Sequence, residues 1–272
     1  MKNRNNYKQK FTENGMLNWG KKGQLAVYVI VAVVIVALIV LGVMFYPKIQ
    51  SAFGVELNPQ DYLTKCVEPI ISDNVALLAN QSGYAMPEGF VVYDGQKVKY
   101  LCYVSDSYKT CKVQQPMIKN NFENELNKLV AVRAVQCVSD LKAEYEKRGY
   151  SVSLGQVSSR VEIVPDKIKI NFKAPMTITK DTSQTFKEFN VEEKSGIYDL
   201  LFIAQSIVDF ESAYGDSETT LYMQYYPNLK IEKIRLEDGT KIYRLSDVIS
   251  KESFEFASRS LVFPPGEIYN TQ

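Results

Sequence analysis

The four cysteines are the residues in this sequence whose chemistry is most sharply defined. They are Cys66, Cys102, Cys111 and Cys137, and no two of them have CxxC spacing. The lack of CxxC spacing argues against a thiol-exchange site, and together with the absence of histidine it also argues against a zinc site. Disulfide bonds are the better prediction, and four cysteines allow three pairings. Four reduced, buried cysteines are the alternative.

Local patterns favour one of these pairings. Residues 99–113 consist of an apolar run, a polar turn and a second run, which is typical of a β-hairpin. A two-residue loop at Asp106 and Ser107 places Cys102 opposite Cys111, within disulfide range. The sequence therefore predicts a Cys102–Cys111 disulfide.

The remaining two cysteines lie in segments with helical periodicity. In residues 58–80, Asn58 is a helix cap and Tyr62, Cys66, Ile70 and Leu77 share one side. Residues 118–149 carry an apolar stripe that ends near Gly149, a residue typical of helix C-termini. The stripe consists of Phe122, Leu126, Leu129, Val130, Cys137, Leu141 and Tyr145. Because both cysteines are expected to face a core, a Cys66–Cys137 disulfide would join the two helices.

Other chemistries find little support. Without histidine the chain lacks Ser-His-Asp and Cys-His catalysis, and its glycines form neither a dinucleotide-binding nor a phosphate-binding loop. A serine–lysine dyad is formally open, but no recognisable motif surrounds any serine. We expect no enzyme activity, no cofactor, no metal and no small-molecule ligand. The absence of a basic stripe also argues against nucleic acid as a partner.

Two further features could mark a surface. Asn80-Gln81-Ser82 is an N-glycosylation tripeptide, so Asn80 is a candidate glycosylation site. Tyrosines cluster at residues 100–108 and 222–226. Tyrosine suits recognition surfaces, although half-buried sheet positions explain these clusters equally well.

An apolar stretch near the N-terminus predicts where the domain is located. Leu25 to Tyr46 are 22 residues without a charge, and as a helix they would be about 33 Å long, enough to cross a bilayer. A signal peptide has a shorter apolar core, and a core helix would not be apolar on all sides. Residues 1–23 carry a net charge of +5, and residues 24–272 carry −4. The positive-inside rule places the N-terminus in the cytoplasm and the C-terminal domain outside the cell membrane.

The junction Lys21-Lys22-Gly23-Gln24-Leu25, followed at once by the apolar stretch, resembles the class III signal peptide of archaeal type IV pilins. The resemblance implies cleavage between Gly23 and Gln24 and retention of the apolar helix as the core of a filament. Other filament or envelope proteins would then be partners. The rest of the chain is similar in general character to archaeal membrane-anchored surface proteins.

The remaining patterns predict a mixed fold. Residues 159–181 alternate between Ile168, Ile170, Phe172 and a row of lysines, as in a strand with one buried face. The lysine row could bind an anionic partner or could simply face solvent. Residues 195–215 have helical periodicity, with Ser195 as the cap and Gly215 as the end. Asp238-Gly239 predicts a hairpin, and residues 253–262 a last strand before Pro264.

We therefore expect an α+β protein in which two or three helices pack on a mostly antiparallel sheet. The expected segments are a basic cytoplasmic segment or leader (1–23), a transmembrane helix (24–47, with 25–46 contacting lipid), a linker (48–57) and an extracytoplasmic domain (58–272). The favoured function is a single-pass, membrane-anchored surface protein with a binding or structural outer domain. A pilin-like filament subunit is the alternative, and an anchored enzyme is a distant third.

Overall fold

The computed structural model describes residues 28–41 and 57–262. The chain divides into two compact units, Met1–Glu56 and Leu57–Gln272. Residues 28–41 are helical with exposed side chains. Within the described ranges, no helix combines the length and the apolar character needed to cross a membrane. The ends of the predicted span and the candidate processing site at Gly23 and Gln24 lie outside the described residues, so these stay predictions.

Helix α2 (Pro59–Asn80) begins as its sequence predicts. The Asn58 side chain accepts a hydrogen bond of 2.9 Å from the Gln60 amide, and Pro59 occupies the first helical position, where its missing N–H costs nothing. The predicted core face is wrong by one residue, because Leu77 is exposed and Cys66 only partly buried. The buried face instead consists of Leu63, Val67, Ile71, Val75 and Leu78.

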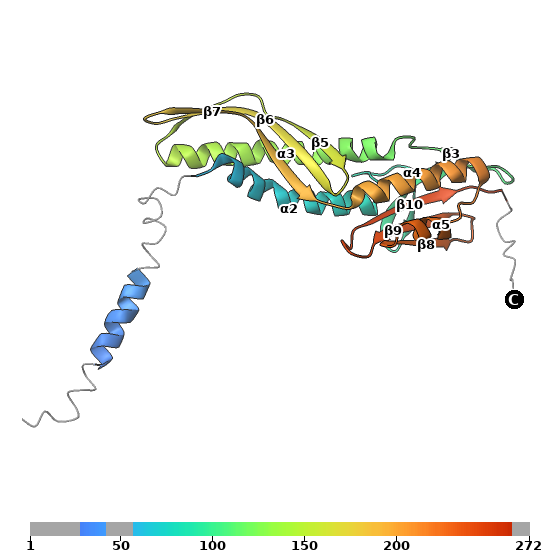
Figure 1. The fold of residues 1–272 in the computed structure, drawn as a ribbon, viewed down its shortest axis with the longest axis horizontal. Coiled ribbons are helices and arrows are strands. Elements are labelled where there is room, and N and C mark those ends of the chain that lie inside the picture. The colour runs from blue at the N-terminus through green and yellow to red at the C-terminus, as the bar shows by residue number, and fades with distance from the viewer. Residues whose placement is uncertain (1–27, 42–56, 263–272) are drawn as a thin grey trace, which may run out of the picture. The chain divides into compact units, whose positions relative to one another are not determined.

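Helix α3 (Ile118–Lys147) is the longest described element, and its predicted stripe is confirmed. Phe122, Leu126, Val130, Cys137, Leu141 and Tyr145 are all buried, and Leu129 is partly buried. Gly149 follows the helix with φ +81°, a backbone conformation that glycine adopts most easily, and its N–H donates to the Glu146 carbonyl. The α+β class is therefore observed, with α2 and α3 packed side by side (Figure 1).

The strands form two sheets, where the sequence suggested one. The six-stranded sheet has the order β1-β2-β10-β9-β8, with β3 paired to β2. Its strands are β1 (Phe90–Tyr93), β2 (Gln96–Tyr103), β3 (Lys112–Val113), β8 (Leu229–Arg235), β9 (Lys241–Asp247) and β10 (Ser253–Arg259). All pairs are antiparallel except β2 with β10. The predicted hairpin at Asp238-Gly239 joins β8 to β9 and is confirmed.

The second sheet surrounds the long strand β6. It contains β4 (Ser151–Leu154), β5 (Ser158–Val164), β6 (Lys167–Thr179) and β7 (Ser183–Lys194), all antiparallel. The lysine row of β6 faces an acidic row on β7: Lys169 lies opposite Glu192, and Lys173 opposite Glu188. Lys167 Nζ also forms an ion pair of 2.7 Å with Glu192. The neighbouring strand therefore balances the charge of these lysines.

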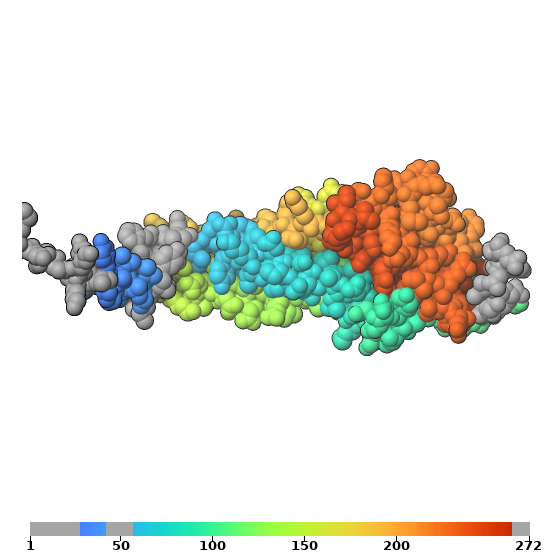
Figure 2. Space-filling model, turned by 90° about the horizontal axis from the view of Figure 1, so that it is seen from below, coloured from blue at the N-terminus to red at the C-terminus, as the bar shows by residue number. Residues whose placement is uncertain are grey.

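Helix α4 (Ile197–Tyr214) and the short helix α5 (Thr220–Tyr225) complete the domain. Figure 1 shows the four-stranded sheet over α2 and α3 and the helix α4 beside the six-stranded sheet. Both sheets and the helices α2, α3 and α4 contribute to one buried apolar cluster. Figure 2 shows α2 (cyan) along one face of this unit, next to the C-terminal strands of the six-stranded sheet (red).

Candidate functional site

Both predicted disulfides are present. Cys66 and Cys137 join α2 to α3 with a Cα–Cα distance of 6.1 Å, and Cys102 and Cys111 are bonded with a Cα–Cα distance of 5.4 Å. No cysteine is free. The predicted hairpin register is wrong, however, because Cys102 lies opposite Val113 and the connection from β2 to β3 is longer than two residues. The bridge therefore joins Cys102 to a residue just before the paired strand β3.

The candidate glycosylation site lies at the end of α2. Asn80 is the last residue of the helix and is partly buried. Ser82, whose hydroxyl completes the tripeptide, is only 1% exposed. Its Oγ accepts a hydrogen bond of 3.0 Å from the Lys99 amide and donates one of 3.3 Å to the Lys99 carbonyl. In the folded domain this hydroxyl is inaccessible, so the predicted modification would have to precede folding.

Asn80 also borders a small cavity at the start of α4. The cavity has a volume of about 200 Å³ and lies where α2, β7 and the turn before β10 meet. Its polar lining residues include Ser72, Asn80, Glu193, Ser195, Ser250 and Glu252. The predicted cap is wrong by one residue, because Gly196 is the N-cap of α4; Ser195 precedes it, and its Oγ accepts a hydrogen bond of 3.2 Å from the Ile197 amide.

A carboxylate of the chain itself occupies the start of α4. Glu252 accepts a hydrogen bond of 2.6 Å from the Ser195 hydroxyl and another from the Gly196 amide. Burial raises the pKa of Glu193, and the nearby Glu68 and Glu252 carboxylates raise it further. The helix N-terminus at this cavity is thus already occupied by a carboxylate of the chain, which makes the cavity a poor site for an anion.

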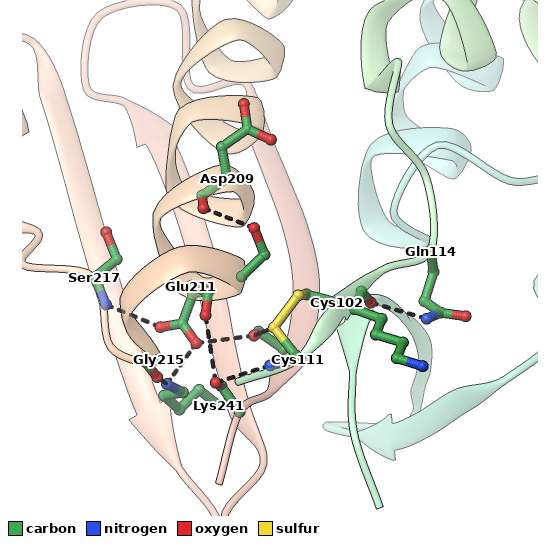
Figure 3. Close-up of a disulfide and its surroundings, with 12 residues drawn as sticks. Cys102, Cys111, Gln114, Asp209, Glu211, Gly215, Ser217 and Lys241 are labelled. Carbon is green, nitrogen blue, oxygen red and sulfur yellow. Dashed lines mark hydrogen bonds and ion pairs between the residues drawn. A yellow bond between two sulfur atoms is a disulfide. The ribbon is translucent and has the colours of Figure 1, made fainter. Parts of the chain in front are cut away.

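A buried polar network anchors the other end of α4 (Figure 3). Glu211 is fully buried, and its Oε2 lies 2.5 Å from Lys241 Nζ and accepts a hydrogen bond of 3.0 Å from Ser258. Its Oε1 accepts from the Ser217 amide at 3.0 Å and from the Tyr243 hydroxyl. Burial raises the pKa of Tyr243, and the Glu211 charge raises it further, so the phenol stays protonated as a donor. Both carboxylate oxygens are satisfied, as a buried charge requires.

The same lysine closes the end of the helix. Lys241 Nζ donates a hydrogen bond of 2.6 Å to the Gly215 carbonyl and lies 3.2 Å from Asp216. Burial opposes the ionisation of Asp216, but the hydrogen bond from Lys233 and the charge of Lys241 hold its pKa below the usual range. Arg235 adds an ion pair of 2.7 Å to Asp216. The turn after α4 is therefore held to β8 and β9 by charged side chains.

The network also reaches the Cys102–Cys111 disulfide. The Cys111 amide donates a hydrogen bond of 3.1 Å to Ser260 Oγ, and the Ser260 hydroxyl donates to the Glu211 carbonyl at 3.3 Å. Cys111 Sγ lies 3.7 Å from Ser258 Oγ. Helix α4, strand β10 and the disulfide loop thus share one buried polar cluster, which joins the end of α4 to the six-stranded sheet and to the disulfide.

The outward face of α4 exposes aromatic side chains among polar ones. Phe202 is 62% exposed and Tyr214 69% exposed, and Phe210 packs on Tyr214 with ring centroids 4.7 Å apart. On α5, Leu221 and Tyr225 are exposed as well, Tyr225 to 82%. We call these five residues the α4–α5 surface. Soluble domains scatter single apolar residues over their surface, but a group of this kind on adjacent helices is typical of an interaction site.

A groove lies beside this surface, between α4 and the start of α3. Its volume is about 430 Å³. The lining residues are Pro116, Met117, Ile118, Lys119, Asn120, Tyr198, Leu201, Phe202, Gln205 and Asp209. Gln205 fixes its geometry, since its Oε1 accepts a hydrogen bond of 3.1 Å from the Ile118 amide and its Nε2 donates one of 3.0 Å to Asp209. The start of α3, which has no side-chain cap of its own, is thereby joined to α4.

The chain matches no protein-family model, no curated protein and no solved structure. The resemblance of residues 21–25 to pilin leaders therefore stays a hypothesis.

The sequence indicated part of this site. The tyrosine cluster at residues 222–226 contributes Tyr225 to the α4–α5 surface. Tyr222 is partly buried, and its hydroxyl forms a hydrogen bond of 2.8 Å with the Ser206 hydroxyl. In the 100–108 cluster Tyr108 is exposed and Tyr100 is partly buried. The groove between α3 and α4 was not predicted from the sequence. Phe202 and Phe210 could have indicated an apolar surface there, because they interrupt the polar side of the helical pattern in residues 195–215.

Proposed function

We propose that this protein is a membrane-anchored surface protein whose extracytoplasmic α+β domain binds a partner. The two disulfides are the main support for a location outside the cytoplasm. Disulfides persist in oxidising compartments outside the cytoplasm and are rare within it. Here both bridges connect elements of one core, and no cysteine is left free. The apolar stretch 25–46 and the positive charge before it support an anchor with its N-terminus inside.

Binding is the role that the domain surface supports best. The α4–α5 surface exposes aromatic side chains on a helix whose end is held by Glu211 and Lys241. A rigid apolar face loses little conformational freedom when a partner covers it. The chain also lacks histidine, the commonest general base, so a non-enzymatic role is the simpler proposal.

The orientation can be tested with single introduced cysteines in the full-length protein in its native cells. Asp181 is exposed between β6 and β7, and Asn3 lies in the basic N-terminal segment. A membrane-impermeant maleimide should label Asp181→Cys on intact cells and Asn3→Cys only after lysis. Labelling in the reverse order would overturn the proposed location.

A pilin-like subunit is the second candidate, supported by the Lys21-Lys22-Gly23-Gln24 junction. Under this proposal a membrane peptidase removes residues 1–23 and the apolar helix packs in a filament. Intact-mass measurement of protein from native membranes should then give a chain that begins at Gln24, and Gly23→Val should block the cleavage. A full-length mass would refute the filament subunit and leave the anchored protein.

A further inference from the structure

The groove between α3 and α4 has an apolar wall on each side. Met117 lies at the start of α3 with 57% of its surface exposed, and Phe202 lies on the outward side of α4. The floor contains the buried Ile118 and Leu201. A groove with exposed apolar walls and a buried apolar floor can bury a large side chain of a partner, at about 25 cal/mol for each Å² of apolar surface removed from water.

Two charged side chains line the groove, Lys119 and Asp209, and only Lys119 forms an ion pair among the residues that the structure describes. Lys119 is neutralised within the chain, because its Nζ lies 2.6 Å from Glu123 and donates to the Ile163 carbonyl at 3.3 Å. Asp209 is exposed, accepts a hydrogen bond from Gln205, and forms no ion pair with the residues that the structure describes. One negative charge is therefore left at the mouth of an apolar groove.

The chain segment that contains Asp209 also carries a net negative charge. From Ser195 to Leu229 the sequence contains five acidic residues and no lysine or arginine. Two of the five, Glu211 and Asp216, are paired with basic residues of β8 and β9, which leaves Asp199, Asp209 and Glu218. Burial raises the pKa of Asp199, and the neighbouring Asp166 and Asp247 raise it further, as expected where negative charges gather.

This charge distribution discriminates between classes of partner. Surfaces that dock on membranes usually surround their apolar residues with lysine and arginine, which are attracted to anionic lipids. The apolar residues of the α4–α5 surface lie among acidic residues and not among lysines or arginines, so an anionic bilayer would be repelled. A polypeptide that carries basic residues beside a large apolar side chain complements both the shape and the charge.

We propose that the groove between α3 and α4 binds a polypeptide segment in which a large apolar side chain is flanked by lysine or arginine. The apolar side chain would contact Met117 and Phe202, and the basic group would pair with Asp209. This inference depends on the proposed binding role of the domain and specifies the chemistry of the partner.

Methyl-labelled methionine gives a direct readout in the full-length protein. Met117 lies in the groove, Met86 is exposed on another part of the domain, and Met176 is buried in the core. The probe is a short peptide of alternating leucine and lysine, and the comparison peptide has glutamate in place of lysine. We expect the lysine peptide to shift the Met117 signal without shifting Met86 or Met176, and the glutamate peptide to bind about two- to fivefold more weakly.

A charge reversal tests the role of the carboxylate. Asp209→Lys should reverse the preference between the two peptides, whereas Asp181→Lys, the same change in an exposed position away from the groove, should leave it unchanged. Phe202→Ala should weaken both peptides. Equal binding of both peptides, shifts spread over Met86 as well, or binding to anionic vesicles instead of peptide would overturn the proposal. None of these results affects the labelling test of membrane orientation, so the two proposals can fail separately.

Discussion

Lys241 Nζ lies 2.5 Å from Glu211 Oε2, and both side chains are buried beneath the last turn of α4. This pair joins the helix to the six-stranded sheet, and through Ser258 and Ser260 the same cluster reaches the Cys102–Cys111 loop. The buried side of α4, opposite its exposed aromatic residues, is thus held to the sheet by a polar network in which the charges are paired.

Lys241→Met should destabilise the full-length protein by about 3–5 kcal/mol, because it leaves the Glu211 carboxylate buried without its cation. Urea unfolding followed by circular dichroism measures the loss. The matched control is Lys230→Met, which removes an exposed pair of 2.8 Å with Glu232 and should cost less than about 1 kcal/mol. Similar losses in the two variants would show that the buried pair is not what fastens α4.

The pKa of Glu193 predicts a pH-dependent effect. Because this pKa is raised in the folded protein, folding favours the protonated form, and stability falls as the pH rises above the usual pKa of a glutamate. Glu193→Gln should therefore stabilise the protein at neutral pH, and the gain should disappear below about pH 4. Urea unfolding midpoints of the wild type and the Glu193→Gln variant, measured from below about pH 4 to neutral pH, test the sign of this stability difference.

Glu192, the adjacent residue, serves as the opposite control. A hydrogen bond from Lys167 lowers its pKa, so folding favours the charged form. Glu192→Gln should leave stability unchanged or slightly reduced at neutral pH. If both variants stabilised the protein equally, the neighbouring Glu68 and Glu252 carboxylates would not be the cause.

The two disulfides should differ in their contribution to the free energy of unfolding. They close loops with sequence separations of 71 and 9 residues. Loop entropy predicts that the double replacement Cys66→Ala and Cys137→Ala costs about 4 kcal/mol, and that Cys102→Ala with Cys111→Ala costs about 3 kcal/mol. Urea unfolding of the two double variants gives the comparison. A clearly larger loss for the short loop would mean that its contacts with the Glu211 cluster outweigh loop entropy.

Gly215 combines two constraints at the end of α4. Its φ is +87°, and a Cβ there would lie 1.8 Å from Val262 Cγ2. Gly95 also has a positive φ, of +78°, but a Cβ there would meet nothing within 4 Å. Gly95→Ala should cost about 1–2 kcal/mol from backbone strain, and Gly215→Ala should cost more because Val262 must move. Equal losses in thermal unfolding would show that the clash is relieved without cost.

Much of the fold follows from local sequence patterns. The helix containing Cys137 lies close to its predicted bounds and the hairpin at Asp238-Gly239 lies where it was predicted, since periodicity and turn residues are strong signals. The single strand predicted over residues 159–181 is wrong, because a turn at Asp166, with φ +66°, divides it into β5 and β6. The face of α2 was predicted one residue away, because Cys66 bonds to α3 at the edge of the core and is not at its centre.

Long-range features could not be predicted from the sequence. The parallel pairing of β2 with β10 joins segments more than 150 residues apart, and nothing local specifies it. The buried network has the same character: Glu211 and Lys241 look like ordinary surface charges in a sequence, and their pairing depends on how α4 meets β9. The groove likewise requires the start of α3 to meet the middle of α4, which Gln205 and Ile118 bring about.

The proposed location of the domain of residues 57–262 is an oxidising compartment outside the cytoplasm. Its most direct test is mass spectrometry of the full-length protein from native membranes, denatured and alkylated before and after reduction. We expect that none of the four cysteines is alkylated before reduction and that all four are alkylated afterwards. Alkylation of all four without reduction would show reduced thiols and would contradict the proposed location.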